Sequence, residues 1–165
     1  MAIISDKGFQ NKKWNTTFLR KVVRSMRRFV NPGNTAFEVA VNSQIYVDKT
    51  GLLAYTNSVI NTKQALICSS RPRRFGKSIT ADMLCAYYSS GCDSDSIFAS
   101  YEIAKSDSYK KHLNQYDVIY LDIQWCMMDA GSAEQTVSYL NYHVIEELKE
   151  IYPQILPDGI RTAYG

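Results

Sequence analysis

Apolar residues in this chain fall into two kinds of pattern, short continuous runs and longer stretches with helical spacing. The runs at 64–69 and 117–123 are typical of buried strands, and residues 44–47 form a weaker third strand candidate. Apolar positions recur three and four residues apart over 79–88, which predicts a helix there, and another helix is expected over roughly 51–59 behind a capping residue. Strands that alternate with helices along a chain favour an α/β fold, in which helices flank a parallel sheet.

Three further helices are expected outside this central part. Apolar residues at helical spacing over 16–30, with Lys and Arg mostly on the other side, predict a basic amphipathic helix. A short helix is expected near 108–113. Ser132 and Gln135 have the spacing of a capping box, so a long helix should begin there and end before Pro153. Its apolar face would carry Val137, Leu140, Val144, Leu148 and Ile151.

The loop between strand 64–69 and helix 79–88 ends in Gly-Lys-Ser, which is the context of a phosphate-binding P-loop. The start of a helix leaves backbone N–H groups unpaired and carries partial positive charge, so it attracts anions. Gly76 lets the backbone approach a phosphate, because no Cβ intervenes. Lys77 can reach the β- and γ-phosphates, and the Ser78 hydroxyl can ligate Mg²⁺. These residues predict binding of a nucleoside triphosphate with Mg²⁺.

One position departs from the usual pattern of this loop. The first glycine of G-x-x-x-x-G-K-[ST] should fall at residue 71, and Arg71 occupies it. Arg71 also precedes Pro72, which favours an extended backbone there. The alternative interpretation is a basic loop that contains Gly-Lys-Ser at a helix start without binding phosphate.

Two segments carry a family resemblance. Arg-Pro-Arg-Arg-Phe-Gly-Lys-Ser at 71–78 and Tyr-Val-Asp-Lys-Thr at 46–50 together resemble signature segments of the predicted AAA-ATPase-like family of bacterial proteins. Members of that family replace the first P-loop glycine in the same way. The resemblance implies a P-loop domain with ATP and Mg²⁺ as cofactors, which in many relatives precedes a nuclease-like domain. The nucleotide-binding residues that it implies are Arg73, Arg74, Phe75, Gly76, Lys77, Ser78 and Ile79, with Ser78 also binding Mg²⁺.

The charged pair in the second segment has two interpretations. Asp48 or Thr50 can cap the helix over 51–59. Asp48 and Lys49 would then form a cap and a local ion pair. The family resemblance suggests instead that both lie beside the nucleotide. Arg73 and Arg74 are similarly open, because they would add positive charge near the phosphates or contact another subunit.

Asp122 ends the second apolar run and is a weak candidate for the Walker B aspartate, which holds Mg²⁺. No glutamate follows it, and in the resembling family a strand ending in Asp-Glu comes further downstream. We therefore expect Asp122 to belong to the second strand of the sheet. The chain then resembles the N-terminal part of such an ATPase, with an incomplete sheet, and ATP hydrolysis should be slow or absent.

Composition bears on whether the protein spans a membrane and on the state of its cysteines. No apolar run approaches the roughly 20 residues of a membrane span. The four cysteines form no CxxC pair, which favours a reduced, cytoplasmic protein without a zinc site, and Cys68 and Cys85 are expected in the core.

The net charge of +3 is distributed unevenly and suggests two segments. Residues 1–34 hold eight Lys or Arg against one acid and are therefore +7, so the 11 bases and 15 acids of residues 35–165 give −4. We expect a basic segment at 1–34 and the P-loop domain at 35–165. The basic helix either packs its apolar stripe on the body or contacts nucleic acid or a membrane surface. A nucleic-acid-binding module and an inactive fragment that needs a missing half are the alternative functions.

Overall fold

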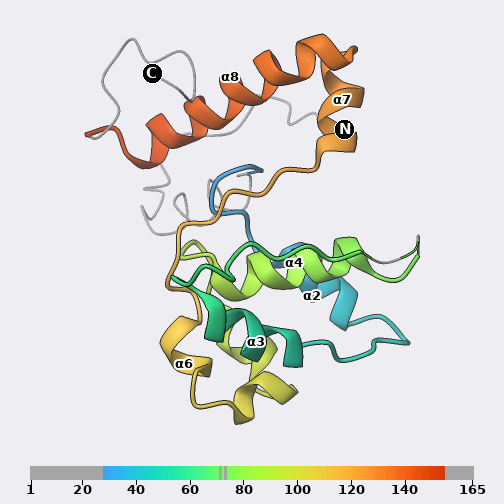
Figure 1. Ribbon diagram of the computed structural model, residues 1–165, viewed down its shortest axis with the longest axis vertical. Coiled ribbons are helices and arrows are strands. Elements are labelled where there is room, and N and C mark those ends of the chain that lie inside the picture. Colours follow the sequence, from blue (N-terminus) through green and yellow to red (C-terminus); the bar gives the residue numbers. More distant parts are fainter. Residues whose placement is uncertain (1–27, 71, 73, 155–165) are drawn as a thin grey trace, which may run out of the picture.

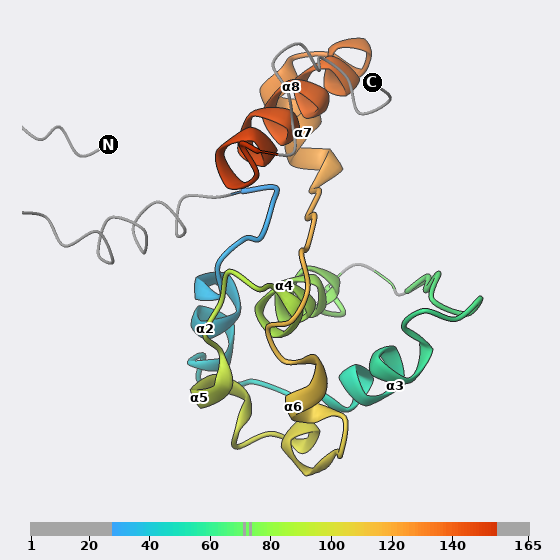
Figure 2. The same ribbon diagram turned by 90° about the vertical axis from the view of Figure 1, so that its left-hand side faces the viewer.

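The computed structural model describes residues 28–70, 72 and 74–154, and these form two groups of helices (Figures 1 and 2). The helices are α2 (Thr35–Val41), α3 (Gly51–Val59), α4 (Lys77–Tyr88), α5 (Asp95–Phe98), the 3-10 helix η1 (Glu102–Lys105), α6 (Tyr109–His112), α7 (Ile123–Ala130) and α8 (Ala133–Ile151). In both views α7 and α8 lie together at one end, and α2, α3, α4 and α6 lie at the other.

The prediction of a parallel sheet is wrong for the described part of the chain, which forms helices and no strands. Residues 64–69 are exposed and non-helical without strand pairing, and the candidate at 44–47 is not a strand either. Leu66 has 95% of its surface exposed, and Cys68 is exposed rather than in the core. An apolar run favours a strand only where a neighbouring segment accepts and donates its backbone hydrogen bonds, and three or more strands are needed for independent stability.

The second predicted strand forms two isolated bridges and then a helix. Tyr116 pairs with Ser89 in parallel, and Ile119 pairs with Val30 in an antiparallel bridge. The segment then enters α7 at Ile123, where strand 117–123 was expected to continue. Each bridge joins a single pair of residues, so neither extends into a ladder.

The helices predicted after residue 50 are confirmed. Helices occupy 51–59 and 77–88, a short helix lies within 108–113, and the Ser132 Oγ accepts a hydrogen bond from the Gln135 N–H at the start of α8. The apolar face of α8 packs as predicted at Leu140, Val144, Leu148 and Ile151. Val137 is an exception, because 64% of its surface is exposed.

The core of the larger group surrounds α4. Its fully buried aromatic rings come from three helices: Phe37 of α2, Tyr87 of α4 and Phe98 of α5. The Phe98 ring stacks on Phe37 with centroids 5.2 Å apart and meets Tyr87 edge-on at 5.3 Å. Leu53 and Met83 belong to the same cluster. This packing fixes α4, and therefore the position at which α4 begins.

A smaller apolar cluster joins the start of the described chain to α7 and α8. Phe29 and Val30 pack against Cys126 of α7. The Glu147 carboxylate of α8 accepts backbone hydrogen bonds from residues 28, 29 and 30 at 3.0, 2.9 and 2.7 Å. Residues 28–30 are not helical, so the helix predicted over 16–30 does not reach its expected end, and its other residues lie outside the described part.

Asn114 holds the C-terminal end of α4. Its side-chain Nδ2 donates to the carbonyls of Ala86, Tyr87 and Ser89 at 3.0, 3.3 and 3.0 Å. Its Oδ1 accepts from the Ser94 N–H at 3.0 Å. The last turn of a helix leaves carbonyls without helical partners, and one amide side chain satisfies several of them here.

Replacing Asn114 with alanine is expected to lower the free energy of unfolding by about 2–3 kcal/mol. The change leaves several carbonyls without their donor, and it puts alanine at a φ of +55°, where asparagine is better tolerated. Urea denaturation of the two proteins measures the difference. The matched control is Gln115→Ala, because exposed Gln115 donates only to the nearby Leu113 carbonyl among the bonds described; a similar loss for both variants would contradict this role.

Candidate functional site

The Gly-Lys-Ser loop leads into α4 with its backbone turned sharply. Gly76 is the N-cap of α4 and adopts a left-handed conformation with a φ of +75°. Arg74, at a φ of +70°, is also left-handed. Such values favour glycine, since a Cβ atom clashes there. Because Gly76 has no side chain, it offers no oxygen to the first-turn amides, which lack the usual side-chain capping bond.

Two lysines from distant parts of the sequence meet at this loop. The Lys77 Nζ bends back and donates to the Pro72 carbonyl at 3.2 Å. The Lys49 Nζ, from the segment before α3, donates to the Phe75 carbonyl at 2.9 Å. Both line one hollow of about 330 Å³, whose other lining residues are Leu52, Ser69, Phe75 and Thr80. That volume is at the lower end of the range of small-molecule sites.

The predicted binding residues lie on the exposed side of the loop and the first turn. Phe75 has 57% and Ile79 40% of its surface exposed, and Arg74, Lys77 and Ser78 are exposed as well. Gly76 is partly buried. Arg71 and Arg73 lie outside the described residues. The described residues of this loop are therefore mostly exposed, and the Lys49 ammonium lies against the loop at the Phe75 carbonyl.

The segment that carries Lys49 is held by Asp48. Its Oδ1 accepts from the Thr50 N–H at 2.8 Å and its Oδ2 from the Glu102 N–H at 3.0 Å. Burial opposes the charged form of Asp48, but these backbone hydrogen bonds outweigh it and hold the pKa of Asp48 below its usual value. Thr50 is the N-cap of α3 and makes no side-chain capping bond, so neither expected side-chain cap forms; Asp48 instead binds the Thr50 N–H just before the helix. The expected ion pair between Asp48 and Lys49 does not form, because the Lys49 ammonium donates to the Phe75 carbonyl of the loop instead.

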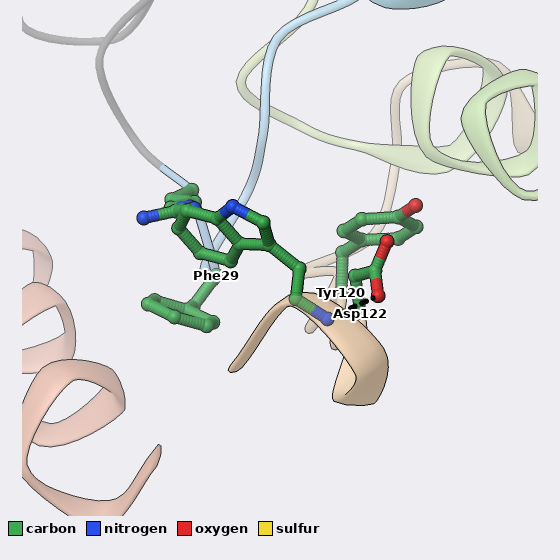
Figure 3. A pocket seen from close by; sticks show the side chains of 5 residues that line it. Phe29, Tyr120 and Asp122 are labelled. Atoms are coloured by element: carbon green, nitrogen blue, oxygen red, sulfur yellow. Dashed lines mark hydrogen bonds between the residues drawn. The ribbon is translucent and has the colours of Figure 1, made fainter. Parts of the chain in front are cut away.

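Asp122 caps a helix and does not end a strand. It is the N-cap of α7, and its Oδ1 accepts from the Trp125 N–H at 3.0 Å, the bond drawn dashed in Figure 3. Figure 3 also shows Tyr120 beside it. These residues line a second hollow of about 190 Å³ with Arg28 and Phe29. The strand predicted to end at Asp122 is therefore wrong, and a capping role explains this carboxylate.

Asp82 is a residue that the sequence reasoning missed. It follows Ser78 by one turn on α4 and is half-buried. Burial, and then the nearby charge of Asp122, raise the pKa of Asp82. Burial together with both carboxylates also raises the pKa of Tyr120 to about 12. Helical spacing from Ser78 was the only signal in the sequence that could have singled out Asp82.

No group of three or more His, Cys, Asp or Glu side chains that could hold a metal ion exists among the described residues. The described carboxylates near α4 thus do not form a metal-binding group by themselves. A Mg²⁺ ion here would need oxygen ligands from a bound phosphate as well. The described helices also include none that is long and apolar enough to cross a membrane.

The predicted nucleic-acid surface cannot be placed from the described chain. Its helix over 16–30 is described only from Arg28 onward. The Arg28 guanidinium lies 3.4 Å from the Asp129 carboxylate and against the Trp125 ring. The one described cation of that helix therefore faces α7 and is engaged within the protein.

Comparison with known proteins gives one family. The family model described as "Predicted AAA-ATPase" matches residues 33–158. No curated protein and no solved structure matches the chain. The matched range includes both segments that carry the two lysines of the loop.

Proposed function

Because the chain belongs to the predicted AAA-ATPase family, we propose that it binds a nucleoside triphosphate with Mg²⁺ at the start of α4. The observation that carries this proposal is the geometry of that start. Gly76 precedes the first turn in the left-handed conformation and has no capping side chain, and the Lys77 ammonium folds back onto the Pro72 carbonyl of the preceding loop. Exposed amides and a cation at one point are what a phosphate group requires.

Each residue of the loop has a distinct task in this proposal. The first-turn amides of α4 would donate to phosphate oxygens, and the Lys77 ammonium would neutralise charge on the β- and γ-phosphates. The exposed Ser78 hydroxyl would ligate Mg²⁺, a hard cation that prefers oxygen. Arg73 and Arg74 would add positive charge near the phosphates. Bound Mg²⁺ supplies electrostatic stabilisation of the phosphate oxygens.

We propose binding rather than rapid hydrolysis. In-line attack on a γ-phosphate needs a residue that orients the attacking water and a carboxylate that holds the metal ion. Asp122, the sequence candidate for the second role, is engaged as the cap of α7.

Replacing Lys77 with alanine is expected to weaken MgATP binding by about 10- to 100-fold, because a charge-assisted hydrogen bond to phosphate contributes about 1.5–3 kcal/mol. Isothermal titration of MgATP into each protein measures the change. Exposed Lys63, which lies outside the hollow, supplies the control variant Lys63→Ala, expected to bind like the unchanged protein. Equal affinity of the Lys77→Ala variant and the unchanged protein would refute the proposal.

A further inference from the structure

We propose that Lys49 is a second phosphate-binding cation of this site, whose ammonium rests on the Phe75 carbonyl until a triphosphate replaces that carbonyl as its acceptor. This inference rests on the proposed function and adds to it a residue outside the Gly-Lys-Ser loop. It also names the feature that Lys49 would recognise, the anionic charge of a polyphosphate chain.

The position of the Lys49 ammonium is the first support. Its Nζ lies 2.9 Å from the Phe75 carbonyl oxygen, one residue before the N-cap of α4. A Cβ atom built on Gly76 would lie only 2.7 Å from the same Nζ. The ammonium therefore sits directly over the residue that gives a phosphate access to the helix start. It also lines the same hollow as Lys77.

The rigidity of the segment that carries Lys49 is the second support. On its N-terminal side Asp48 is bonded to two backbone amides, and on its C-terminal side Thr50 is fully buried. The Thr50 Oγ1 accepts from the Ile103 N–H at 3.2 Å. Tyr46 packs edge-on against Phe37 with ring centroids 6.0 Å apart. Only the flexible side chain of Lys49 is then free to change partner, which keeps the entropic cost of binding low.

The chemistry of the exchange is the third support. An ammonium has three donors, and the Phe75 carbonyl is a neutral acceptor on an exposed loop. A phosphate oxygen is a charged acceptor, and charge-assisted hydrogen bonds are roughly twice as strong as neutral ones. Moving from carbonyl to phosphate is thus favourable. The gain should grow with the number of phosphates, since the attraction follows the total negative charge near the ammonium.

Isothermal titration with MgATP, MgADP, AMP and inorganic tripolyphosphate tests this role in the full chain. The variants are Lys49→Gln, Lys49→Arg and Lys77→Ala. The control is Lys149→Gln, since Lys149 lies on α8 at the other end of the molecule from α3 in both views (Figures 1 and 2). We expect Lys49→Gln to weaken MgATP and tripolyphosphate binding by about 10-fold and AMP binding by less than about 2-fold. Lys49→Arg, which keeps the charge, should stay within about 3-fold of the unchanged protein.

The outcomes separate this inference from the proposed function. If Lys77→Ala weakens MgATP binding and Lys49→Gln does not, Lys49 has no role in binding and the inference fails alone. If Lys49→Gln weakens ATP and AMP binding equally, Lys49 only supports the loop, and the inference again fails. If the unchanged protein binds no triphosphate, both fail.

A second measurement on the unchanged protein covers the case in which Lys49→Gln does not fold. Acylation of lysines, followed by mass spectrometry, reports which amines a ligand shields. We expect tripolyphosphate to slow the labelling of Lys49 and Lys77 and to leave Lys149 unchanged. Undiminished labelling of Lys49, with Lys77 protected, would overturn the inference.

Discussion

Replacing Gly76 with valine is expected to weaken MgATP binding by about 100-fold or more. Gly76 has a φ of +75°, which a β-branched residue adopts only with strain of about 1–3 kcal/mol. A Cβ atom there would also lie 2.7 Å from the Lys49 Nζ and displace that ammonium. A loop that relaxes this strain turns its amides away from the phosphate, at a further cost of about 1.5–3 kcal/mol. Isothermal titration with MgATP measures the loss.

Two other glycines give the matched controls for this change. Gly131 has a φ of +82° at the end of α7, so Gly131→Val carries the backbone strain without touching the loop. Gly33→Val brings neither backbone strain nor a steric clash, because Gly33 does not have a positive φ and no atom lies within 4 Å of a Cβ placed there. We expect Gly131→Val to lower stability and Gly33→Val to be neutral, with MgATP affinity unchanged in both. Normal affinity in the Gly76→Val protein would show that phosphate does not approach the backbone at this residue.

Replacing Phe98 with alanine is expected to lower the free energy of unfolding by about 3–5 kcal/mol, the range for a fully buried phenylalanine. The Phe98 side chain is completely buried between Phe37 and Tyr87, on helices that the chain places far apart in sequence. Its loss opens a cavity that four-residue α5 cannot easily close by moving. Urea denaturation followed by circular dichroism measures the change.

An exposed aromatic residue serves as the control for this substitution. Tyr55 lies on α3 with 52% of its surface exposed, and Tyr55→Ala should change stability by no more than about 0.5 kcal/mol. A loss below about 1 kcal/mol for Phe98→Ala would mean that the cluster around α4 is not the core that fixes the loop.

Helices could be predicted from this sequence because their hydrogen bonds are local. The start of α8 carries its own cap at Ser132, and the hydrogen bonds of α3 at 51–59 join residues four apart, so both helices could be recognised from local sequence. Strands depend on partners elsewhere in the chain. Leu66 and Ile119 belong to apolar runs that suit strands, yet both are exposed, because neither run lies beside an extended neighbour over more than single residues.

The candidate site could be predicted in part. Gly76, Lys77 and Ser78 form a contiguous motif, and the sequence places them correctly at the start of a helix. Lys49 lies 26 residues before Phe75, and its approach to the loop depends on how α3 packs, which no local pattern records. The sequence could offer it only as one of two interpretations. Asp122 shows the reverse error, since its position after an apolar run suggested a strand end and it caps α7 instead.

The most direct test of the central claim is whether the first-turn amides of α4 bind phosphate. Titration of ¹⁵N-labelled protein with MgATP, followed by amide NMR spectra, reports this residue by residue. We predict that the amide signals of Gly76, Lys77, Ser78 and Ile79 shift most, that those of α8 stay in place, and that Lys77→Ala removes the response at the same MgATP concentration. Unchanged signals at these four amides, with shifts elsewhere or none, would contradict the account.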